Sequence, residues 1–215
     1  MSRKVPFVVL DGVEGCGKSS QLEWLAEAFD DKGFEVTTTF EPGGTTAGMA
    51  IREILLHRSD LNLAPMTEAL LFSAARSQLI EEVIRPKSKC AGVLLCDRYA
   101  PSTWAYQGYA GGALTSKIGQ LNKLVAGEFK PDLVIILDLD PAVGFARKTG
   151  NKDRIEQKDL AYHRKVRKGF LDFADKHKSY SAIVDADQTM AKVHHDIIRV
   201  VNERLGLKLI PVFEV

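Results

Sequence analysis

The chain has 215 residues, of which 45% are hydrophobic and 27% charged, a balance typical of a globular protein long enough to bury a core of its own. Its 29 basic residues nearly offset its 28 acidic ones, and the net charge of +1 excludes a general electrostatic attraction to nucleic acid or to an anionic membrane. The three cysteines are scattered, with neither a disulfide framework nor a metal-binding spacing, which favours a reducing cytoplasm.

Five short apolar runs separated by helical patterns predict a doubly wound α/β fold with buried parallel strands. The runs are Phe7–Leu10, Val36–Phe40, Val93–Cys96, Leu133–Leu137 and Ala182–Val184. An aspartate follows four of them, at Asp11, Asp97, Asp138 and Asp185. Because open α/β sheets bind ligands at the carboxyl ends of their strands, we expect these carboxylates to matter. No long linker interrupts the pattern, which predicts one domain over residues 1–215.

The first run leads into a glycine-rich segment with the spacing of a phosphate-binding loop. Gly12, Gly17, Lys18 and Ser19 fill the pattern G-x-x-x-x-G-K-[ST], between a predicted strand and a predicted helix. Glycines let backbone N–H groups approach a polyphosphate, and the helix that follows adds its positive end. Lys18 can reach the β- and γ-phosphates of a nucleotide, and the Ser19 hydroxyl can bind Mg²⁺.

The second run ends in a turn, Glu41–Thr45, which two adjacent glycines and a proline indicate. A cis peptide bond is compatible with Pro42, although trans is the default. A helix from about Thr46 then presents Arg52.

A longer helix is predicted from Met66 to about Arg85, where Pro86 ends it. Its apolar stripe runs through Phe72, Leu79 and Val83, and Arg76 falls on the same stripe. Two interpretations of this arginine remain open. It extends from the edge of the core into solvent, or it donates hydrogen bonds to a flat ring that stacks on Phe72.

The third run passes into Asp97 and Arg98. A carboxylate at the end of a buried strand, facing a phosphate loop, is well placed to hold Mg²⁺ directly or through water. The arginine beside it can hold phosphate oxygens with its planar fork.

Nine basic residues and three acidic ones lie between Arg147 and Lys168. From Arg147 to Arg154 this composition predicts a mobile lid over phosphates. From Lys158 onward it predicts a solvated helix face.

The final helix, Thr189 to about Leu205, has the apolar spacing of a scaffold element. We expect its neighbouring residues His194 and His195 to lie on the surface and not to bind metal.

Phosphate loops occur in ATPases, GTPases, small-molecule kinases and signalling switches. GTPases read guanine with an N-K-x-D segment after a strand, and 151–154 does not match that spacing. Hydrolytic ATPases usually place an acidic base after the strand-end aspartate, where this chain has Arg98. A cation there suits an enzyme that brings two phosphate groups together, which favours transfer from a nucleotide to a phosphorylated acceptor.

Over nearly its whole length the chain resembles the thymidylate kinases of bacterial type. The segments that carry the resemblance are Gly12–Ser19, Glu41–Thr45, Leu71–Arg76, Asp97–Tyr99 with Ser102, Ala105–Gly108 and Asp153–Glu156. The resemblance implies the P-loop nucleoside monophosphate kinase fold, with a five-stranded parallel sheet and a short lid at about 147–156. It further implies phosphorylation of dTMP to dTDP with ATP and Mg²⁺ by a cytoplasmic homodimer, without a nucleic-acid or membrane partner.

The resemblance also implies roles for individual residues. ATP would be held by Gly12, Val13, Glu14, Gly15, Cys16, Gly17, Lys18, Ser19 and Ser20, with Arg147 against the adenine. At the base of dTMP, Phe72 would stack on thymine, Arg76 would hydrogen-bond its carbonyl edge, and Gln107 would lie nearby. At the sugar, Glu14 would contact the 3′-hydroxyl and Tyr106 would crowd the 2′ position. Ser102 would line the acceptor site, and Arg52 and Arg98 would hold the phosphate. Lys18, Arg98 and Arg154 would be catalytic, while Ser19 and Asp97 would serve Mg²⁺.

The chain departs from the family pattern at Gly15. Some members carry an arginine at this position of the phosphate loop, and bacterial relatives supply a catalytic arginine from the lid instead. Here the lid has arginines only at its ends, so Arg154 or Arg147 takes the role, or a lysine replaces it. Three other functions also remain open: a deoxynucleoside kinase, a kinase for another nucleoside monophosphate, and a nucleotide-dependent switch with little turnover.

Overall fold

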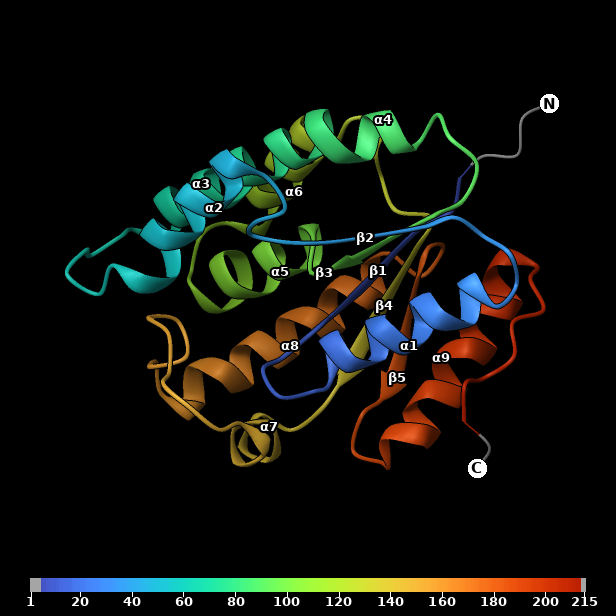
Figure 1. Ribbon diagram of the computed structural model, residues 1–215. Helices are drawn as coiled ribbons and strands as arrows, with labels where there is room; N and C mark the ends of the chain where they lie inside the picture. The colour runs from blue at the N-terminus through green and yellow to red at the C-terminus, as the bar shows by residue number, and fades with distance from the viewer. Residues whose placement is uncertain (1–4, 214–215) are drawn as a thin grey trace.

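The computed structural model describes residues 5–213, and its centre is a parallel sheet of five strands (Figure 1). The strand order is β2-β3-β1-β4-β5. The strands are β1 Phe7–Gly12, β2 Val36–Phe40, β3 Val93–Asp97, β4 Leu133–Asp138 and β5 Ser181–Asp185. The predicted α/β fold with five parallel strands is therefore confirmed.

Four of the five strands run further than the apolar runs predict, because pairing continues into the polar residues at their ends. In β1 and β3, for example, Leu10 is aligned with Asp97. The prediction that all five strands are buried is wrong for the two edges of the sheet. Phe40 in β2 is 41% exposed and Ile183 in β5 is 49% exposed, since each edge strand has one neighbour and an incomplete helical cover.

Helices cover both faces of the sheet. On one face lie α1 Lys18–Asp30 and α9 Met190–Leu205, which pack against each other. On the other face lie α5 Ala100–Thr103, the wider π-helical segment η3 Trp104–Ala110, and α8 Leu160–Lys176. The remaining helical segments are α2 Thr46–Arg52, η1 Glu53–His57, α3 Pro65–Leu79, η2 Ile80–Ile84, α4 Arg85–Lys87, α6 Thr115–Ala126 and α7 Pro141–Arg147.

The long helix predicted from Met66 is present as α3, η2 and α4. Its stripe is confirmed, with Arg76 and Leu79 buried and with Phe72 and Val83 half-buried. The helical conformation passes through Pro86 and ends at Lys87, because a proline in the first turn of α4 costs the helix little.

The prediction that both histidines of the last helix lie on the surface is wrong for His194. Its ring is fully buried between α9 and α1, where it packs edge-on against Trp24 at a centroid distance of 5.8 Å. The Val212 N–H donates to its Nε2 at 3.3 Å. The helix otherwise begins as predicted, since the Thr189 side chain caps it by accepting from the Lys192 N–H.

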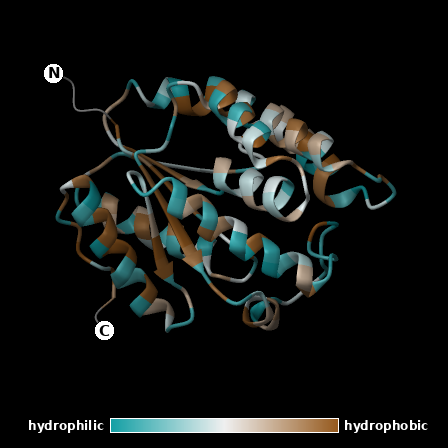
Figure 2. Ribbon diagram, turned by 180° about the vertical axis from the view of Figure 1, so that it is seen from behind, coloured by the Kyte–Doolittle hydropathy of each residue, from teal (hydrophilic) through white to brown (hydrophobic). Residues whose placement is uncertain are grey.

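Within residues 5–213, no helix is long and apolar enough to cross a membrane. Figure 2 shows teal, hydrophilic residues among the brown, hydrophobic ones on several of the helices.

Candidate functional site

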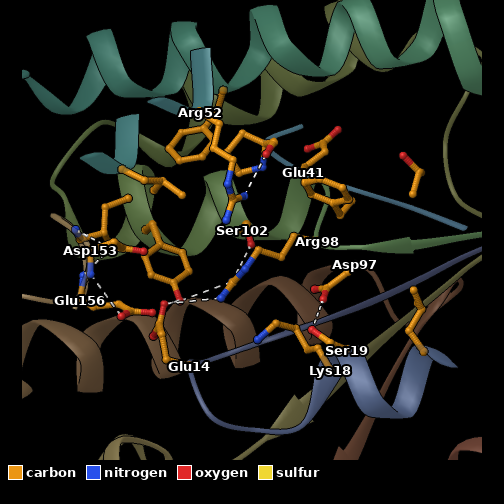
Figure 3. Close-up of a pocket in the computed structure, with 18 of the residues that line it drawn as sticks. Glu14, Lys18, Ser19, Glu41, Arg52, Asp97, Arg98, Ser102, Asp153 and Glu156 are labelled. Carbon is orange, nitrogen blue, oxygen red and sulfur yellow. Dashed lines mark hydrogen bonds and ion pairs between the residues drawn. The ribbon is translucent and has the colours of Figure 1, made fainter. Parts of the chain in front are cut away.

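A cavity of about 780 Å³ opens at the carboxyl ends of β1, β2 and β3. Its walls come from the phosphate loop, the start of α1, the segment after β2, the helices α2 and α3, the segment after β3, and the end of the lid. Figure 3 shows Lys18 and Ser19 at one end of this cavity and Asp153 and Glu156 at the other. Segments that are far apart in the sequence therefore share one space at the edge of the sheet where ligands are expected.

The phosphate loop has the conformation that its glycines predict. Gly15 and Gly17 have φ values of 71° and 92°, in the left-handed region that glycine tolerates. The Lys18 ammonium group folds back and donates to the carbonyl oxygens of Gly12 at 3.2 Å and Val13 at 2.8 Å. The loop therefore presents a cation and the positive end of α1 to the same space.

Ser19 and Asp97 meet as predicted. The Ser19 hydroxyl donates to Oδ2 of Asp97 at 2.9 Å, and Oδ1 of Asp97 is buried without a hydrogen-bond partner among the described residues. A hydroxyl oxygen beside a carboxylate with an unused oxygen fits Mg²⁺, which takes a few protein oxygens and completes its shell with water and phosphate oxygens.

The other strand-end carboxylates do not line the cavity. Asp11 is fully buried and accepts hydrogen bonds from the backbone N–H groups of Tyr99 and Ser102 and from the Ser102 hydroxyl. Asp138 is held by Arg167 in a two-bond ion pair at 2.7 and 2.8 Å. Of the four strand-end carboxylates, Asp97 alone lines the cavity, so the expectation of a ligand contact is not met by Asp11, Asp138 or Asp185.

Arg98 occupies the middle of the cavity (Figure 3). Its guanidinium donates to the carbonyl oxygen of Gly12 and to the Ser102 hydroxyl, each at 3.2 Å, and it lies 3.5 Å from Oε1 of Glu14. Burial alone would lower the pKa of Arg98, but Tyr106 and the surrounding carboxylates hold it well above its usual value. Arg98 is thus a permanently charged group between the phosphate loop and the rest of the cavity.

Arg52 reaches the same space from the opposite wall (Figure 3), where its Nη1 donates to the carbonyl oxygen of Pro42 at 2.9 Å. Burial lowers the pKa of Arg52; Asp153 opposes that shift and the positive charge of Arg98 adds to it. Two like charges that face one cavity are stabilised by an anion between them.

Glu14 is buried beneath these arginines and is shared by several partners. Tyr106 donates a short hydrogen bond to its Oε1, and Nδ1 of His163 lies 3.4 Å from its Oε2. Burial would raise the pKa of this carboxyl, but His163, Arg98, Lys18 and Tyr106 together hold it well below its usual range. Glu14 is therefore an anion at the junction of the phosphate loop and the rest of the cavity.

The structure contradicts the first interpretation of Arg76, because its guanidinium does not extend into solvent, and its hydrogen bonding to a ring on Phe72 stays a prediction. The side chain is 1% exposed and forms a buried ion pair with Glu41 at 2.7 Å. It also donates to Thr103 at 3.1 Å and to Asn122 at 3.0 Å. These contacts use four of its five N–H groups, and one N–H on Nη1 remains unused. Arg76 and Phe72 both line the cavity.

The two arginines of the lid do not line the cavity. Arg154 donates to the carbonyl oxygen of Leu55 at 2.9 Å and pairs with Glu68 at 2.8 Å, which ties the lid to η1 and α3. Arg147 donates to the carbonyl oxygen of Ala186 at 3.0 Å, in the loop after β5. Lys148, by contrast, does line the cavity and pairs with Glu156.

Sequence reasoning missed His163 and Glu68, which support the predicted residues from outside the cavity. Glu68 accepts a hydrogen bond from Gln107 at 3.0 Å and binds Arg154, so it connects α3, η3 and the lid. His163 lies on the buried stripe of α8 with Val166 and Phe170. A polar residue within an apolar helical stripe is the sequence pattern by which it could have been predicted.

Comparisons with known proteins agree with one another. A family model described as thymidylate kinase matches residues 10–197. A thymidylate kinase from Deinococcus radiodurans is 42% identical over 200 residues, which cover 92% of this chain and 97% of that protein. One from Ectopseudomonas mendocina is 44% identical over 193 residues, which cover 89% and 92%. The crystal structure of thymidylate kinase from Ehrlichia chaffeensis superposes with a TM-score of 0.75 at 30% identity, covering 93% of this chain and 99% of that one.

Proposed function

This chain belongs to the thymidylate kinase family, and we propose that the cavity beside its phosphate loop is where ATP and dTMP meet. The enzyme transfers the γ-phosphoryl group of ATP to dTMP, giving ADP and dTDP. The observation that carries the assignment is the pair Arg52 and Arg98, which face one another next to Lys18 and supply the charge that two phosphate groups require.

The donor side is built from the phosphate loop and its neighbours. Backbone N–H groups from Gly12 to Ser20 and the Lys18 ammonium group hold the triphosphate. Arg147 lies against the adenine, which its hydrogen bond to the loop after β5 supports. Ser19 and Asp97 hold Mg²⁺, which neutralises charge on the phosphates when it is bound.

The acceptor side reads the thymine base. Phe72 stacks on the ring, and the unused N–H of Arg76 donates to a thymine carbonyl oxygen. Gln107, oriented by Glu68, lies near the base. Glu14 and Tyr106 meet the sugar, the first at the 3′-hydroxyl and the second against the 2′ position, where a ribose hydroxyl would collide.

Transfer depends on position and charge. Arg52, Arg98 and Ser102 hold the dTMP phosphate in line with the γ-phosphorus while Lys18 holds the donor. The attacking group is already a phosphate oxyanion, so no general base is required. This explains why Glu14, the carboxylate nearest to Arg98, can remain committed to Tyr106 and His163.

The test is a coupled assay of ADP formation against a panel of thymidine, dTMP, dUMP, dCMP, dGMP and UMP. We expect dTMP to give the highest kcat/KM, and UMP to be rejected because of its 2′-hydroxyl. Preference for thymidine would show a deoxynucleoside kinase, preference for another monophosphate would show a different acceptor pocket, and negligible turnover with every acceptor would show a switch.

A homodimer is the assembly that we propose for this enzyme. Exposed apolar side chains gather on the outer face of α3 and α6, with Leu70 53% exposed and Leu124 81% exposed, and a hollow lined by Ser77 and Leu124 lies between these two helices. Leu70 and Leu124 lie on two neighbouring helices, so they can belong to one interface. The exposed Ile210, by contrast, lies after α9 and outside this face.

Light scattering should give the mass of a dimer for the wild type and of a monomer for Leu124→Lys, because a buried charge at the interface costs far more than an exposed one. Ile210→Lys is the matched control, since residue 210 is 77% exposed outside the α3–α6 face, and it should remain dimeric. A monomeric wild type would contradict the assignment.

The cytoplasm is the location that fits this activity, since the three cysteines are free thiols. Residues 1–215 would act as one kinase domain, with the lid at about 147–156 as its mobile part.

A further inference from the structure

We propose that His163 is a positioning residue for the acceptor sugar. It fixes the carboxylate of Glu14, so that this carboxylate can accept a hydrogen bond from the 3′-hydroxyl of the monophosphate. This role rests on the proposed function, in which Glu14 meets that hydroxyl. Three observations carry it: Glu14 is anchored at its backbone and at one oxygen, the His163 ring is the polar contact of its other oxygen, and the ring itself is held firmly.

The backbone of Glu14 and one of its carboxylate oxygens are held by neighbouring elements. A β-carbon added to Gly144 would overlap the carbonyl oxygen of Glu14, so α7 packs directly against the backbone of the phosphate loop. At the end of the side chain, Oε1 accepts the short hydrogen bond from Tyr106 and lies 3.5 Å from the Arg98 guanidinium. These contacts locate Oε1, but a carboxylate held by one oxygen can still rotate about it.

His163 supplies the second point of attachment. Its Nδ1 lies 3.4 Å from Oε2 of Glu14, and within the described part of the chain neither ring nitrogen has another polar partner. Since a carboxylate oxygen only accepts, a neutral ring must carry its proton on Nδ1 in order to donate to it. With both oxygens held, the plane of the carboxylate is fixed. Each oxygen can accept more than one hydrogen bond, so Glu14 can still accept one from a hydroxyl in the cavity that it lines.

The ring of His163 is fully buried and packed on two sides. It meets Phe145 and Tyr162 edge-on, at centroid distances of 4.7 Å and 5.3 Å. The Tyr162 hydroxyl also donates to the carbonyl oxygen of Tyr106 at 3.1 Å, where α8 packs along η3. The first turn of α8 therefore holds both members of the hydrogen-bonded pair Glu14 and Tyr106.

A fixed carboxylate matters because a ligand gains most from an acceptor that is already in position. When a flexible side chain has to be ordered on binding, part of the free energy of the new contact is lost. His163 does not line the cavity, so it acts on the sugar through Glu14. Its loss should therefore weaken the binding of acceptors with a 3′-hydroxyl and leave the binding of those without one unchanged.

The experiment compares binding of dTMP with binding of 2′,3′-dideoxythymidine monophosphate, which lacks the 3′-hydroxyl, by calorimetry. His163→Leu removes both ring nitrogens at a similar volume. His163→Asn is the conservative variant, because its amide nitrogen can take the place of Nδ1. His194→Leu is the matched control, since it makes the same change at another fully buried histidine that does not line the cavity.

For the wild type we expect the 3′-hydroxyl to strengthen binding by about 10–100-fold, the range for a hydrogen bond to a charged group. His163→Leu should weaken dTMP binding by about 3–10-fold and change binding of the dideoxy analogue by less than about twofold. His163→Asn and His194→Leu should keep the wild-type ratio of the two affinities.

A His163→Leu variant that binds both ligands more weakly by the same factor would show a general loosening of the fold and overturn the proposal. Equal weakening of dTMP binding in His163→Leu and His163→Asn would overturn it too, as would a wild type that binds both ligands alike. A wild type that prefers another monophosphate would refute the proposed function. The same comparison, made with that monophosphate and its 3′-deoxy form, would then decide the role of His163.

Discussion

Arg98 has a φ of 68°, directly after β3, in a backbone region that favours glycine. Within residues 5–213 it is the one non-glycine residue with a positive φ. The left-handed conformation costs a residue with a β-carbon about 1–2 kcal/mol. The surrounding hydrogen bonds hold it, since the Arg98 N–H donates to the carbonyl oxygen of Leu10 and the guanidinium is fixed by Gly12 and Ser102. Local strain thus directs a charged group into the cavity.

Replacing Arg98 by alanine and by glycine separates the strain from the charge. Both variants lose the guanidinium and should lose at least about 10²-fold in turnover. Glycine adopts a positive φ freely, so Arg98→Gly should be more stable than Arg98→Ala by about 1 kcal/mol in urea unfolding at pH 7.5. In helices and strands, by contrast, alanine is the more stabilising of these two residues. If Arg98→Ala were more stable than Arg98→Gly, the backbone at residue 98 would have to relax to a negative φ.

At the scale of the elements, the ion pair between Glu41 and Arg76 joins the end of β2 to α3. The two side chains are 3% and 1% exposed. Burial raises the pKa of the Glu41 carboxyl, and Arg76 opposes part of that rise. The pKa of Arg76 is raised, because the carboxylate outweighs the effect of burial on the guanidinium. The pair orients the N–H that we assign to thymine, so its purpose is position and not stability.

A double-mutant cycle tests that assignment. Glu41→Gln and Arg76→Met each leave a buried charge without its partner and should each cost about 3–5 kcal/mol of unfolding free energy. The double variant Glu41→Gln/Arg76→Met removes both charges, and it should be more stable than the sum of the single effects by at least about 2 kcal/mol. All three should show reduced kcat/KM for dTMP. Additive losses would show that the two side chains are independent.

Across the whole molecule, the features that could be predicted from the sequence are those set by local spacing. The phosphate loop needs particular residues at four of eight positions, and the presence and order of the strands follow from the apolar runs. For this reason Lys18, Ser19 and Asp97 lie where the pattern places them.

What could not be predicted depends on partners far along the chain. Arg154 turns away from the phosphates because Leu55 and Glu68, distant in the sequence, accept its hydrogen bonds. The polar partners of Arg76 come from the turn after β2, from α5 and from α6, and no periodicity within α3 reveals them. Sequence spacing gives the chemistry that a residue can perform, while tertiary contacts decide whether the group is free to perform it.

His194 is another residue whose environment is set by the whole fold, since α1, α9 and the segment near Val212 enclose it. Burial, with a smaller effect from His195, lowers its pKa to about 4. In the unfolded chain the value is about 6.5. Between pH 6.5 and 4 the unfolded state therefore binds the extra proton, and stability falls as the pH falls.

The prediction is that the wild type loses about 1–2 kcal/mol of unfolding free energy between pH 7 and pH 5 that His194→Gln does not lose. Urea unfolding at both pH values measures it, and the carboxylates cancel in the comparison because the wild type and the variant share them. His195→Gln is the control, because it removes the half-buried neighbour and should retain the pH dependence of the wild type. Equal slopes for the wild type and His194→Gln would mean that the ring is protonated within the fold, with water reaching the interface of α1 and α9.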